Sequence, residues 1–188
     1  MTLYVNCCPR ENSRTDRLAR ALLDTLGAYE QLRLYDEPLR PLDAARLAAR
    51  DALLARGAYE NDLFRYARQF AAADRIVIAA PYWDLSFPAQ LKIYLENVYV
   101  PGIVTRYDET GRPVGLCRAA QLDYVTTAGG PYDGRYGYEY LRTMVRDYFG
   151  IPKTTLLKAE LLDIAGSDPE AILRKALDDA GLTPSGRR

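Results

Sequence analysis

Short apolar runs alternate along the chain with segments in which apolar residues recur every three or four positions. An apolar run of four to eight residues is typical of a strand, whereas recurrence at helical spacing is typical of a helix with one buried face. The first run ends before Pro9, which cannot donate a hydrogen bond to a sheet. The pattern predicts strands over residues 2–7, 30–35, 76–80, 122–127 and 153–159.

The segments between the strands carry helical stripes. Leu18, Leu22 and Leu26 form one such stripe, and Gly27 follows it as a C-terminal stop. The Ala-rich and Arg-rich stretch over residues 42–56 is expected to be helical and largely solvated. Further helices are predicted over residues 61–73, from Pro88 through Val98, over a face shared by Tyr140, Leu141, Met144, Val145, Tyr148 and Phe149, and over residues 169–180.

Alternation of strands with helices through the whole chain predicts an α/β fold, a doubly wound parallel sheet with helices on both faces. Residues 1–182 are expected to form a single domain, and residues 183–188 a frayed tail. Residues 99–120 contain several Pro and Gly residues and show little periodicity. A connection this long in a compact domain is usually functional, so we expect it to cover a substrate or contact a second subunit.

Composition excludes several classes of protein. The chain has 188 residues, enough to bury a core without disulfides, and its 25 basic residues are balanced by 25 acidic ones. This balance removes the basic footprint that phosphate-backbone binding requires, so nucleic acid is not expected as a partner. With no His, the chain lacks the base of Ser-His-Asp and Cys-His mechanisms and the imidazole of most zinc and haem sites.

The three cysteines fit neither a metal site nor a disulfide framework. Cys7 and Cys8 are adjacent and Cys117 is distant, which is neither a CxxC spacing nor an even set. No metal is therefore expected, and a reducing, cytoplasmic location is the simpler interpretation. The N-terminus lacks the features of a signal peptide, and the longest apolar run, Ile76 to Pro81, is far shorter than a membrane span.

Candidate chemistry lies in the loops that follow three of the predicted strands. In an open parallel sheet, ligands bind beyond the carboxyl ends of the strands, which points to residues 8–15, 81–87 and 127–133. The first loop delivers two hydroxyls and a row of backbone N–H groups to a helix N-terminus, where the helix dipole favours an anion such as phosphate. An ordinary N-cap without a ligand is an equally good interpretation of this loop alone.

The other two loops suit a flat ring and a close backbone approach. Residues 81–88 place Tyr82, Trp83 and Phe87 between two prolines, and such a segment offers a wall to a heteroaromatic ring. Taken singly, an aromatic residue such as Trp83 or Phe87 fits a core or interface position better than a ligand contact. Gly129 and Gly130 let the backbone approach a ligand closely because neither projects a side chain.

Together the three loops resemble those of the FMN-dependent members of the flavodoxin-like superfamily, in particular the NAD(P)H:quinone reductases and azoreductases. The resemblance runs over most of the chain. Its most specific element is a strand ending in Ala80-Pro81, followed by Pro88-Ala89-Gln90-Leu91-Lys92 at the start of a helix. It implies a flavodoxin-like five-stranded sheet, one FMN, NADH or NADPH as co-substrate, and a homodimer.

The resemblance also implies roles for individual residues. The first loop, with Cys8 and Arg10, would hold the FMN phosphate chiefly through Ser13, Arg14 and Thr15. The second loop, from Pro81, would lie along the isoalloxazine ring, and the third would approach its pyrimidine edge. The implied contacts of these two loops are Tyr82, Trp83, Asp84 and Leu85, and Thr127, Ala128, Gly129 and Gly130.

Two positions depart from the family pattern. Cys8 stands where many relatives have a serine in the phosphate loop, and a thiol is only a weak donor. Some relatives also have a histidine soon after the Gly-Gly pair, whereas this chain offers tyrosines, of which Tyr132 and Tyr136 are the candidates for a catalytic phenol. No acid or base is strictly required, because the flavin carries the chemistry.

The implied function is transfer of a hydride from NADH or NADPH through FMN to a quinone, an azo compound or a similar aromatic acceptor. Two alternatives stay open. One is a flavodoxin-type electron carrier, although such carriers typically have an acidic surface and this chain is neutral. The other is a flavin-free α/β protein that binds phosphate or acts as a regulatory subunit. The sequence does not distinguish NADH from NADPH.

Overall fold

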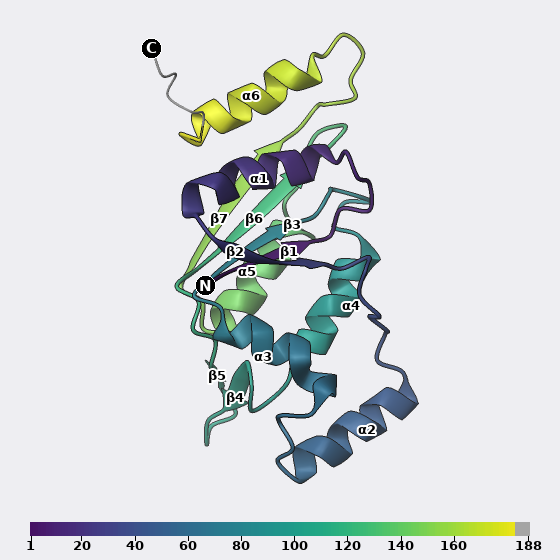
Figure 1. Cartoon of the computed structure of the whole chain (residues 1–188), viewed down its shortest axis with the longest axis vertical. Coiled ribbons are helices and arrows are strands. Elements are labelled where there is room, and N and C mark those ends of the chain that lie inside the picture. The colour runs from purple at the N-terminus through teal and green to yellow at the C-terminus, as the bar shows by residue number, and fades with distance from the viewer. Residues whose placement is uncertain (183–188) are drawn as a thin grey trace.

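The computed structural model describes residues 1–182 (Figure 1). Strands and helices alternate along them, and each strand of the central sheet lies where an apolar run predicts one. The predicted tail, residues 183–188, lies outside the described residues. In chain order the elements are β1 (Thr2–Asn6), α1 (Arg14–Leu26), β2 (Tyr29–Arg33), α2 (Ala44–Ala55), a 3-10 turn η1 (Asp62–Phe64), α3 (Arg65–Ala72), β3 (Arg75–Ala79), α4 (Ala89–Val98), β4 (Thr105–Tyr107), β5 (Pro113–Gly115), β6 (Gln121–Thr127), α5 (Tyr138–Asp147), β7 (Lys153–Ala159) and α6 (Pro169–Asp179).

The central sheet has five parallel strands in the order β2-β1-β3-β6-β7. This is the flavodoxin-like order, in which the chain reverses direction across the sheet between β1 and β3. The fold class predicted from the sequence is therefore confirmed. Its consequence for function is that the carboxyl ends of β1, β3, β6 and β7 meet along one edge.

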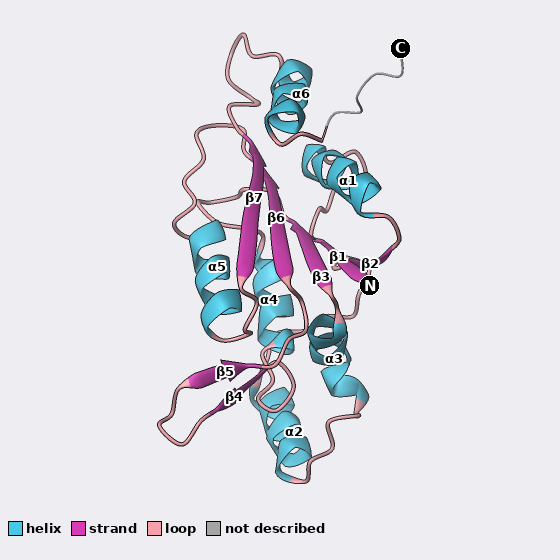
Figure 2. Cartoon of the chain, turned by 90° about the vertical axis from the view of Figure 1, so that its left-hand side faces the viewer, coloured by secondary structure: helices cyan, strands magenta, loops and turns pink. Residues whose placement is uncertain are grey.

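Helices cover both faces of the sheet (Figure 2). On one face α1 and α6 pack against the strands and bury residues such as Leu23 and Leu173, and on the other α3, α4 and α5 bury Phe70, Leu91 and Leu141. The strands between them are apolar on both sides, as expected for a parallel sheet. Helix α2 buries only Leu53, so the prediction of a largely solvated helix is confirmed.

The region 99–120 differs from its prediction. It contains a short antiparallel hairpin of β4 and β5, and the chain that follows is anchored by the N–H of Cys117, which donates to the Phe149 carbonyl at 3.2 Å, and by that of Ala120, which donates to the Asp74 carbonyl at 3.0 Å. These contacts lie at the amino ends of the strands, opposite the edge where ligands bind. Within one chain this region therefore does not line the cavity, and a contact with a second subunit stays a prediction.

The apolar face predicted for α5 is also corrected. Leu141, Val145 and Phe149 are fully buried, whereas Tyr140 and Tyr148 are more than one third exposed. Residues four apart lie on one side of a helix, so the six apolar residues form two neighbouring stripes, one buried and one exposed. None of the helices among residues 1–182 is both long enough and apolar enough to cross a membrane.

Gly115 provides a test of how the hairpin is packed. A Cβ at this position would lie 2.1 Å from the backbone nitrogen of Gly150, and neither backbone segment can yield like a flexible side chain. We expect Gly115→Ala to lower the free energy of unfolding by about 1–3 kcal/mol, as overpacking does, and the melting temperature by roughly 2–12 °C.

Gly134→Ala is the matched control, because its added Cβ would make only ordinary contacts of 3.5 Å or more. It should change the free energy of unfolding by no more than about 0.5 kcal/mol. Equal stability of the two variants in urea titrations would contradict the close approach of β5 to Gly150.

Candidate functional site

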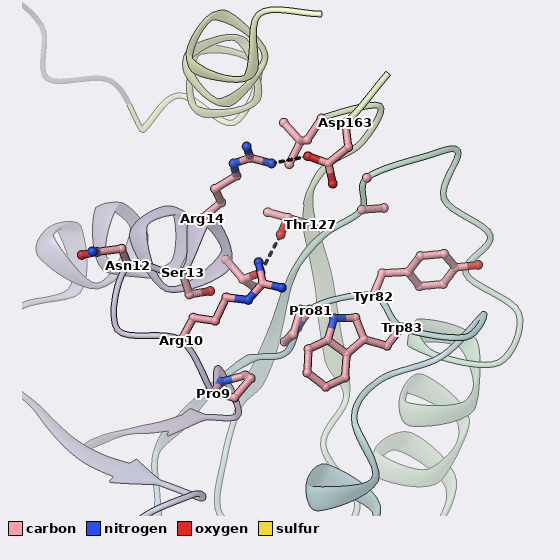
Figure 3. A pocket seen from close by; sticks show the side chains of 14 residues that line it. Pro9, Arg10, Asn12, Ser13, Arg14, Pro81, Tyr82, Trp83, Thr127 and Asp163 are labelled. Atoms are coloured by element: carbon pink, nitrogen blue, oxygen red, sulfur yellow. Dashed lines mark hydrogen bonds and ion pairs between the residues drawn. The ribbon is translucent and has the colours of Figure 1, made fainter. Parts of the chain in front are cut away.

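A cavity of about 420 Å³ opens at the carboxyl edge of the sheet (Figure 3). Its size lies within the range of roughly 300–1,000 Å³ that is usual for small-molecule sites. The walls come from the β1–α1 loop, from the loops after β3 and β6, and from the segment after β7. The lining residues are Pro9, Arg10, Asn12, Ser13, Arg14, Thr15, Pro81, Tyr82, Trp83, Thr127, Ala128, Gly129, Leu162 and Asp163.

A buried carboxylate holds the β1–α1 loop in place. Asp16 Oδ1 accepts hydrogen bonds from the Tyr4 hydroxyl at 2.5 Å and from Asn6 Nδ2 at 2.9 Å, while Oδ2 accepts from Arg20 Nε at 2.9 Å. Asn6 in turn accepts from the backbone N–H of Cys8 at 2.8 Å. Burial and the neighbouring carboxylate raise the pKa of Tyr4 far above its usual range, so its hydroxyl stays a donor.

One end of the cavity is rich in donors. Arg10, Ser13 and Arg14 line it at the start of α1, and the first-turn N–H groups of that helix have no acceptor within the helix. Ser13 caps the helix only loosely, since its Oγ lies 3.4 Å from the N–H of Asp16. Two guanidinium groups beside a positive helix end make this part of the cavity suited to an anion.

Thr15 joins the first loop to the third. Its hydroxyl lies 2.6 Å from that of Thr127, and both side chains line the cavity. In such a pair one hydroxyl donates to the other, so the accepting hydroxyl keeps a proton for a further acceptor. The pair therefore both links two loops and retains one donor for a ligand.

The second loop extends the pairing of β3 with β6 and then turns back sharply. The N–H of Tyr82 donates to the Thr127 carbonyl at 3.0 Å, and Trp83 and Ser86 exchange hydrogen bonds of 3.0 and 2.8 Å across a two-residue turn. The turn residues Asp84 and Leu85 have φ of 50° and 67°, a left-handed conformation that is unfavourable for residues other than glycine. Such strain is often found at ligand sites.

The segment after β7 holds the third loop in place through backbone hydrogen bonds. The carbonyls of Gly129 and Gly130 accept hydrogen bonds from Asp163 N at 2.9 Å and Leu161 N at 3.1 Å. A Cβ at Gly129 would lie 2.5 Å from the Asp163 carboxylate, so a larger residue here would displace that side chain. Because the N–H and C=O of one peptide point in opposite directions, the N–H of Gly130 faces away from Asp163.

Most of the residues expected at the site lie around one cavity. Arg10, Ser13, Arg14 and Thr15 come from the first loop, and they meet residues of the two other loops. Gly130 is adjacent to the cavity without lining it, and Asp84 and Leu85 lie at the tip of the turn beyond it. The residues that the structure brings together from the second and third loops are Pro81, Tyr82, Trp83, Thr127, Ala128 and Gly129.

Cys8 is the exception in the first loop. It is 1% exposed, its Sγ lies 3.8 Å from the Ala79 carbonyl, and it does not line the cavity. Burial raises the pKa of this thiol to about 11, so it is not an activated thiolate at neutral pH. The structure therefore places Cys8 behind the loop as a small packing residue rather than in contact with a ligand.

Neither candidate phenol faces the cavity. The Tyr132 ring packs edge-on against Tyr82 with ring centroids 4.9 Å apart, and its hydroxyl is buried without a hydrogen-bond partner in the described part of the chain. Burial raises the pKa of Tyr132 to about 12. Tyr136 lines a different hollow, over α5. The geometry thus gives no support to a catalytic role for either residue.

The cavity includes residues that the sequence interpretation did not single out. They are Pro9, Asn12, Leu162 and Asp163, of which Asp163 Oδ1 accepts a hydrogen bond from Arg14 Nη1 at 2.8 Å. The sequence did contain a signal for Leu162 and Asp163, because they follow the predicted strand over residues 153–159, whose carboxyl end reaches the same edge of the sheet. The segment has no glycine or aromatic pattern, and it was therefore not singled out as part of the site.

The residues present fit a ligand with an anionic end and a flat ring system. The donors around Arg10 and Arg14 suit a phosphate, and Tyr82 and Trp83 provide an aromatic wall. Gly129 projects no side chain into the cavity, so the backbone of the third loop can approach a ligand closely. This donor set matches what the resemblance implies for FMN.

Comparison with known proteins agrees with this architecture. The FMN-dependent NADH:quinone oxidoreductase of Clostridium beijerinckii is 35% identical over 196 residues, covering 96% of this chain and 96% of that protein. A second relative, the FMN-dependent NADH:quinone oxidoreductase 2 of Clostridium acetobutylicum, is 42% identical over 127 residues. That alignment covers 64% of this chain and 62% of the relative, which is under two thirds of its length.

Solved structures share the fold. The FMN-dependent NADH-azoreductase of Bacillus anthracis in complex with FMN superposes with a TM-score of 0.80 at 22% identity, over 95% of this chain and 94% of that one. A family model described as a flavodoxin-like fold matches residues 1–181. Since the match spans nearly all described residues and a relative is 35% identical over 96% of its length, the chain belongs to this flavodoxin-like family.

Proposed function

We propose that the chain is an FMN-dependent oxidoreductase that transfers a hydride from NADH or NADPH to a quinone, an azo compound or a similar aromatic acceptor. The observation that carries the proposal is the cavity itself, in which a cationic end and an aromatic wall meet beyond the carboxyl ends of β1 and β3, where the strand order reverses. In sheets of this strand order, FMN binds at that point. The names of the two clostridial relatives support the same chemistry.

The first loop would hold the phosphate. Arg10 and Arg14 supply charge, Ser13 and the Thr15–Thr127 pair supply hydroxyl donors, and the start of α1 supplies backbone N–H groups. Asp163 keeps Arg14 at the rim of the cavity through its 2.8 Å hydrogen bond. Charge-assisted hydrogen bonds of this kind are roughly twice as strong as neutral ones.

The second and third loops would hold the ring system. Held there, FMN would supply the two-electron transfer between the nicotinamide and the acceptor. Tyr82 and Trp83 would shield the ring from water, and the N–H of Gly130, in the loop beside the cavity, would donate to its polar edge. Fixed donors stabilise negative charge that develops there without needing to reorganise.

The central experiment is purification of the full chain, followed by an absorption spectrum and an NADH or NADPH oxidation assay with a quinone. We expect flavin bands from noncovalent FMN and turnover that depends on the quinone. A protein that binds FMN but does not oxidise either nucleotide would instead be an electron carrier. A protein that neither retains nor takes up FMN would be a flavin-free phosphate-binding or regulatory protein.

Removal of the phosphate donors should weaken FMN selectively. We expect the Ser13→Ala and Thr15→Val double variant to bind FMN roughly tenfold or more weakly, because each hydrogen bond to a charged group contributes about 1.5–3 kcal/mol. Riboflavin, which lacks the phosphate, should bind parent and variant equally. Titration of the apoprotein followed by flavin fluorescence measures both.

Thr25→Val serves as the matched control, since it removes a hydroxyl from the last turn of the same helix, where it bonds to the Leu22 carbonyl. Its FMN affinity should equal that of the parent. Unchanged FMN affinity in the double variant, or an equal loss for riboflavin, would refute the phosphate assignment.

We further propose that the chain forms a homodimer with the flavin near the subunit boundary. Of the aromatic residues in the segment from Tyr94 to Tyr107, Tyr94 is fully buried in the core of the subunit and cannot contribute to an interface, whereas Tyr107 is exposed. The exposed stripe of α5 supports the proposal better. It lines a hollow of about 740 Å³ with Tyr99, Arg135, Tyr136, Glu139, Tyr140, Thr143, Met144 and Tyr148.

The mass in solution tests the dimer. We expect light scattering at micromolar concentration to give about twice 21.2 kDa, and Tyr140→Glu to shift the mass toward the monomer because a charge would enter an apolar contact. Tyr59→Glu, at an exposed tyrosine before η1, should leave the mass unchanged. A monomeric parent would overturn the proposal.

The remaining proposals concern location and partners. We propose a reducing, cytoplasmic location without a membrane partner, supported by the three cysteines, which are all free thiols, two of them buried. The partners would be a second copy of the chain and small aromatic acceptors.

A further inference from the structure

A second hollow, of about 530 Å³, lies beside the candidate flavin site. Its lining residues are Tyr35, Trp83, Asp84, Ser86, Phe87, Pro88, Ala89 and Gln90. Trp83 is shared, because it lines both this hollow and the flavin cavity. We propose that the hollow is a subsite for the distal ring of a neutral, multi-ring aromatic acceptor, with Tyr35 and Trp83 as its walls. This inference rests on the proposed function and extends it to the acceptor.

Two large aromatic side chains are exposed around this hollow. Tyr35 is 40% exposed and Trp83 is 43% exposed, whereas most large apolar residues of the chain are buried. Phe87 and Pro88 add further apolar surface. Aromatic rings that face one hollow bind a flat ring by stacking or edge contacts, which contribute about 0.5–1.5 kcal/mol beyond burial alone.

The backbone on both sides of the hollow is held firmly. Tyr35 directly follows Leu34, whose N–H donates to the Asn6 carbonyl at 2.9 Å and whose carbonyl accepts from Gln90 Nε2 at 3.0 Å. Trp83 is held by its two hydrogen bonds with Ser86. The walls therefore belong to the sheet edge and to a closed turn, and neither needs to be ordered when a ligand binds.

Charge separates the two cavities and selects the ligand of each. The flavin cavity contains Arg10 and Arg14, whereas no Lys or Arg is among the residues that line the second hollow, and Asp84 is. A nicotinamide dinucleotide carries phosphates that would be repelled by Asp84 and find no cation. A neutral quinone or azo compound meets no such penalty, so the acceptor rather than the nucleotide fits this subsite.

Trp83 makes the proposal directly measurable. It is the only tryptophan of the chain, so fluorescence at tryptophan excitation comes from this shared wall, and Tyr35, which lines the second hollow but not the flavin cavity, shows which of the two the ligand occupies. We expect a two-ring naphthoquinone to quench the apoprotein saturably, with free tryptophan amide as the control for absorption by the quinone. Tyr35→Ala should raise the apparent dissociation constant about 2- to 12-fold, the equivalent of one aromatic contact.

Two variants control for indirect effects. Tyr35→Phe keeps the ring and should behave as the parent, and Tyr59→Ala removes a similarly exposed tyrosine far from the hollow and should also behave as the parent. Urea denaturation checks that Tyr35→Ala has the parent's stability.

Steady-state kinetics of the FMN-loaded protein provides the second measurement. Tyr35→Ala should raise KM for the naphthoquinone by a similar factor with kcat unchanged, because the lost contact stabilises the bound substrate and the transition state equally. KM for NADH and for a one-ring benzoquinone should not change. An equal change for both quinones would contradict a distal-ring subsite.

The outcomes separate this inference from the proposed function. Quenching that is not saturable, or that is equal in the parent and Tyr35→Ala, overturns the subsite whether or not the protein is an oxidoreductase. Saturable, Tyr35-dependent quenching together with absence of turnover overturns the proposed function and leaves an aromatic binding site at Tyr35 and Trp83.

Discussion

The buried carboxylate of Asp16 is the interaction on which the candidate site depends. It receives hydrogen bonds from Tyr4 and Asn6 on β1 and from Arg20 one turn along α1. A strand and the helix that follows it are thereby joined beneath the loop that connects them. An unpaired buried carboxylate would be very unfavourable, so the three donors must stay in place. Their positions fix both ends of the β1–α1 loop.

The loops at the sheet edge are linked to one another as well as to the sheet. The Thr15–Thr127 hydroxyl pair joins the first loop to the third, the Tyr82 N–H joins the second to the third, and the Asp163 N–H joins the last segment to Gly129. A cavity enclosed by such mutually bonded loops is largely formed before a ligand arrives. Binding then costs little ordering of the backbone, which favours affinity.

Trp83 stands between two environments of opposite character. On one side lie guanidinium groups and a helix N-terminus, and on the other lie Tyr35, Phe87 and Asp84. The strained turn at Asp84 and Leu85 holds Trp83 in this position, at a cost of about 1–2 kcal/mol for each left-handed residue. The two hollows beside Trp83 thus differ in charge, because one is lined by arginines and the other by an aspartate.

The sequence by itself determined the five strands of the central sheet, the helices around it and three of the site's loops, because apolar periodicity and Pro or Gly punctuation are local properties. It did not determine the β4–β5 hairpin, whose residues show little periodicity. The sequence also identified Ser13, Thr15 and Trp83, because they lie in loops that directly follow predicted strands. Only the tertiary structure decided that Cys8 and Tyr132 face away from the cavity, that Asp163 reaches Arg14, and that Tyr35 shares a hollow with Trp83. These facts depend on side-chain direction and on contacts between residues up to 149 positions apart, which no local pattern records.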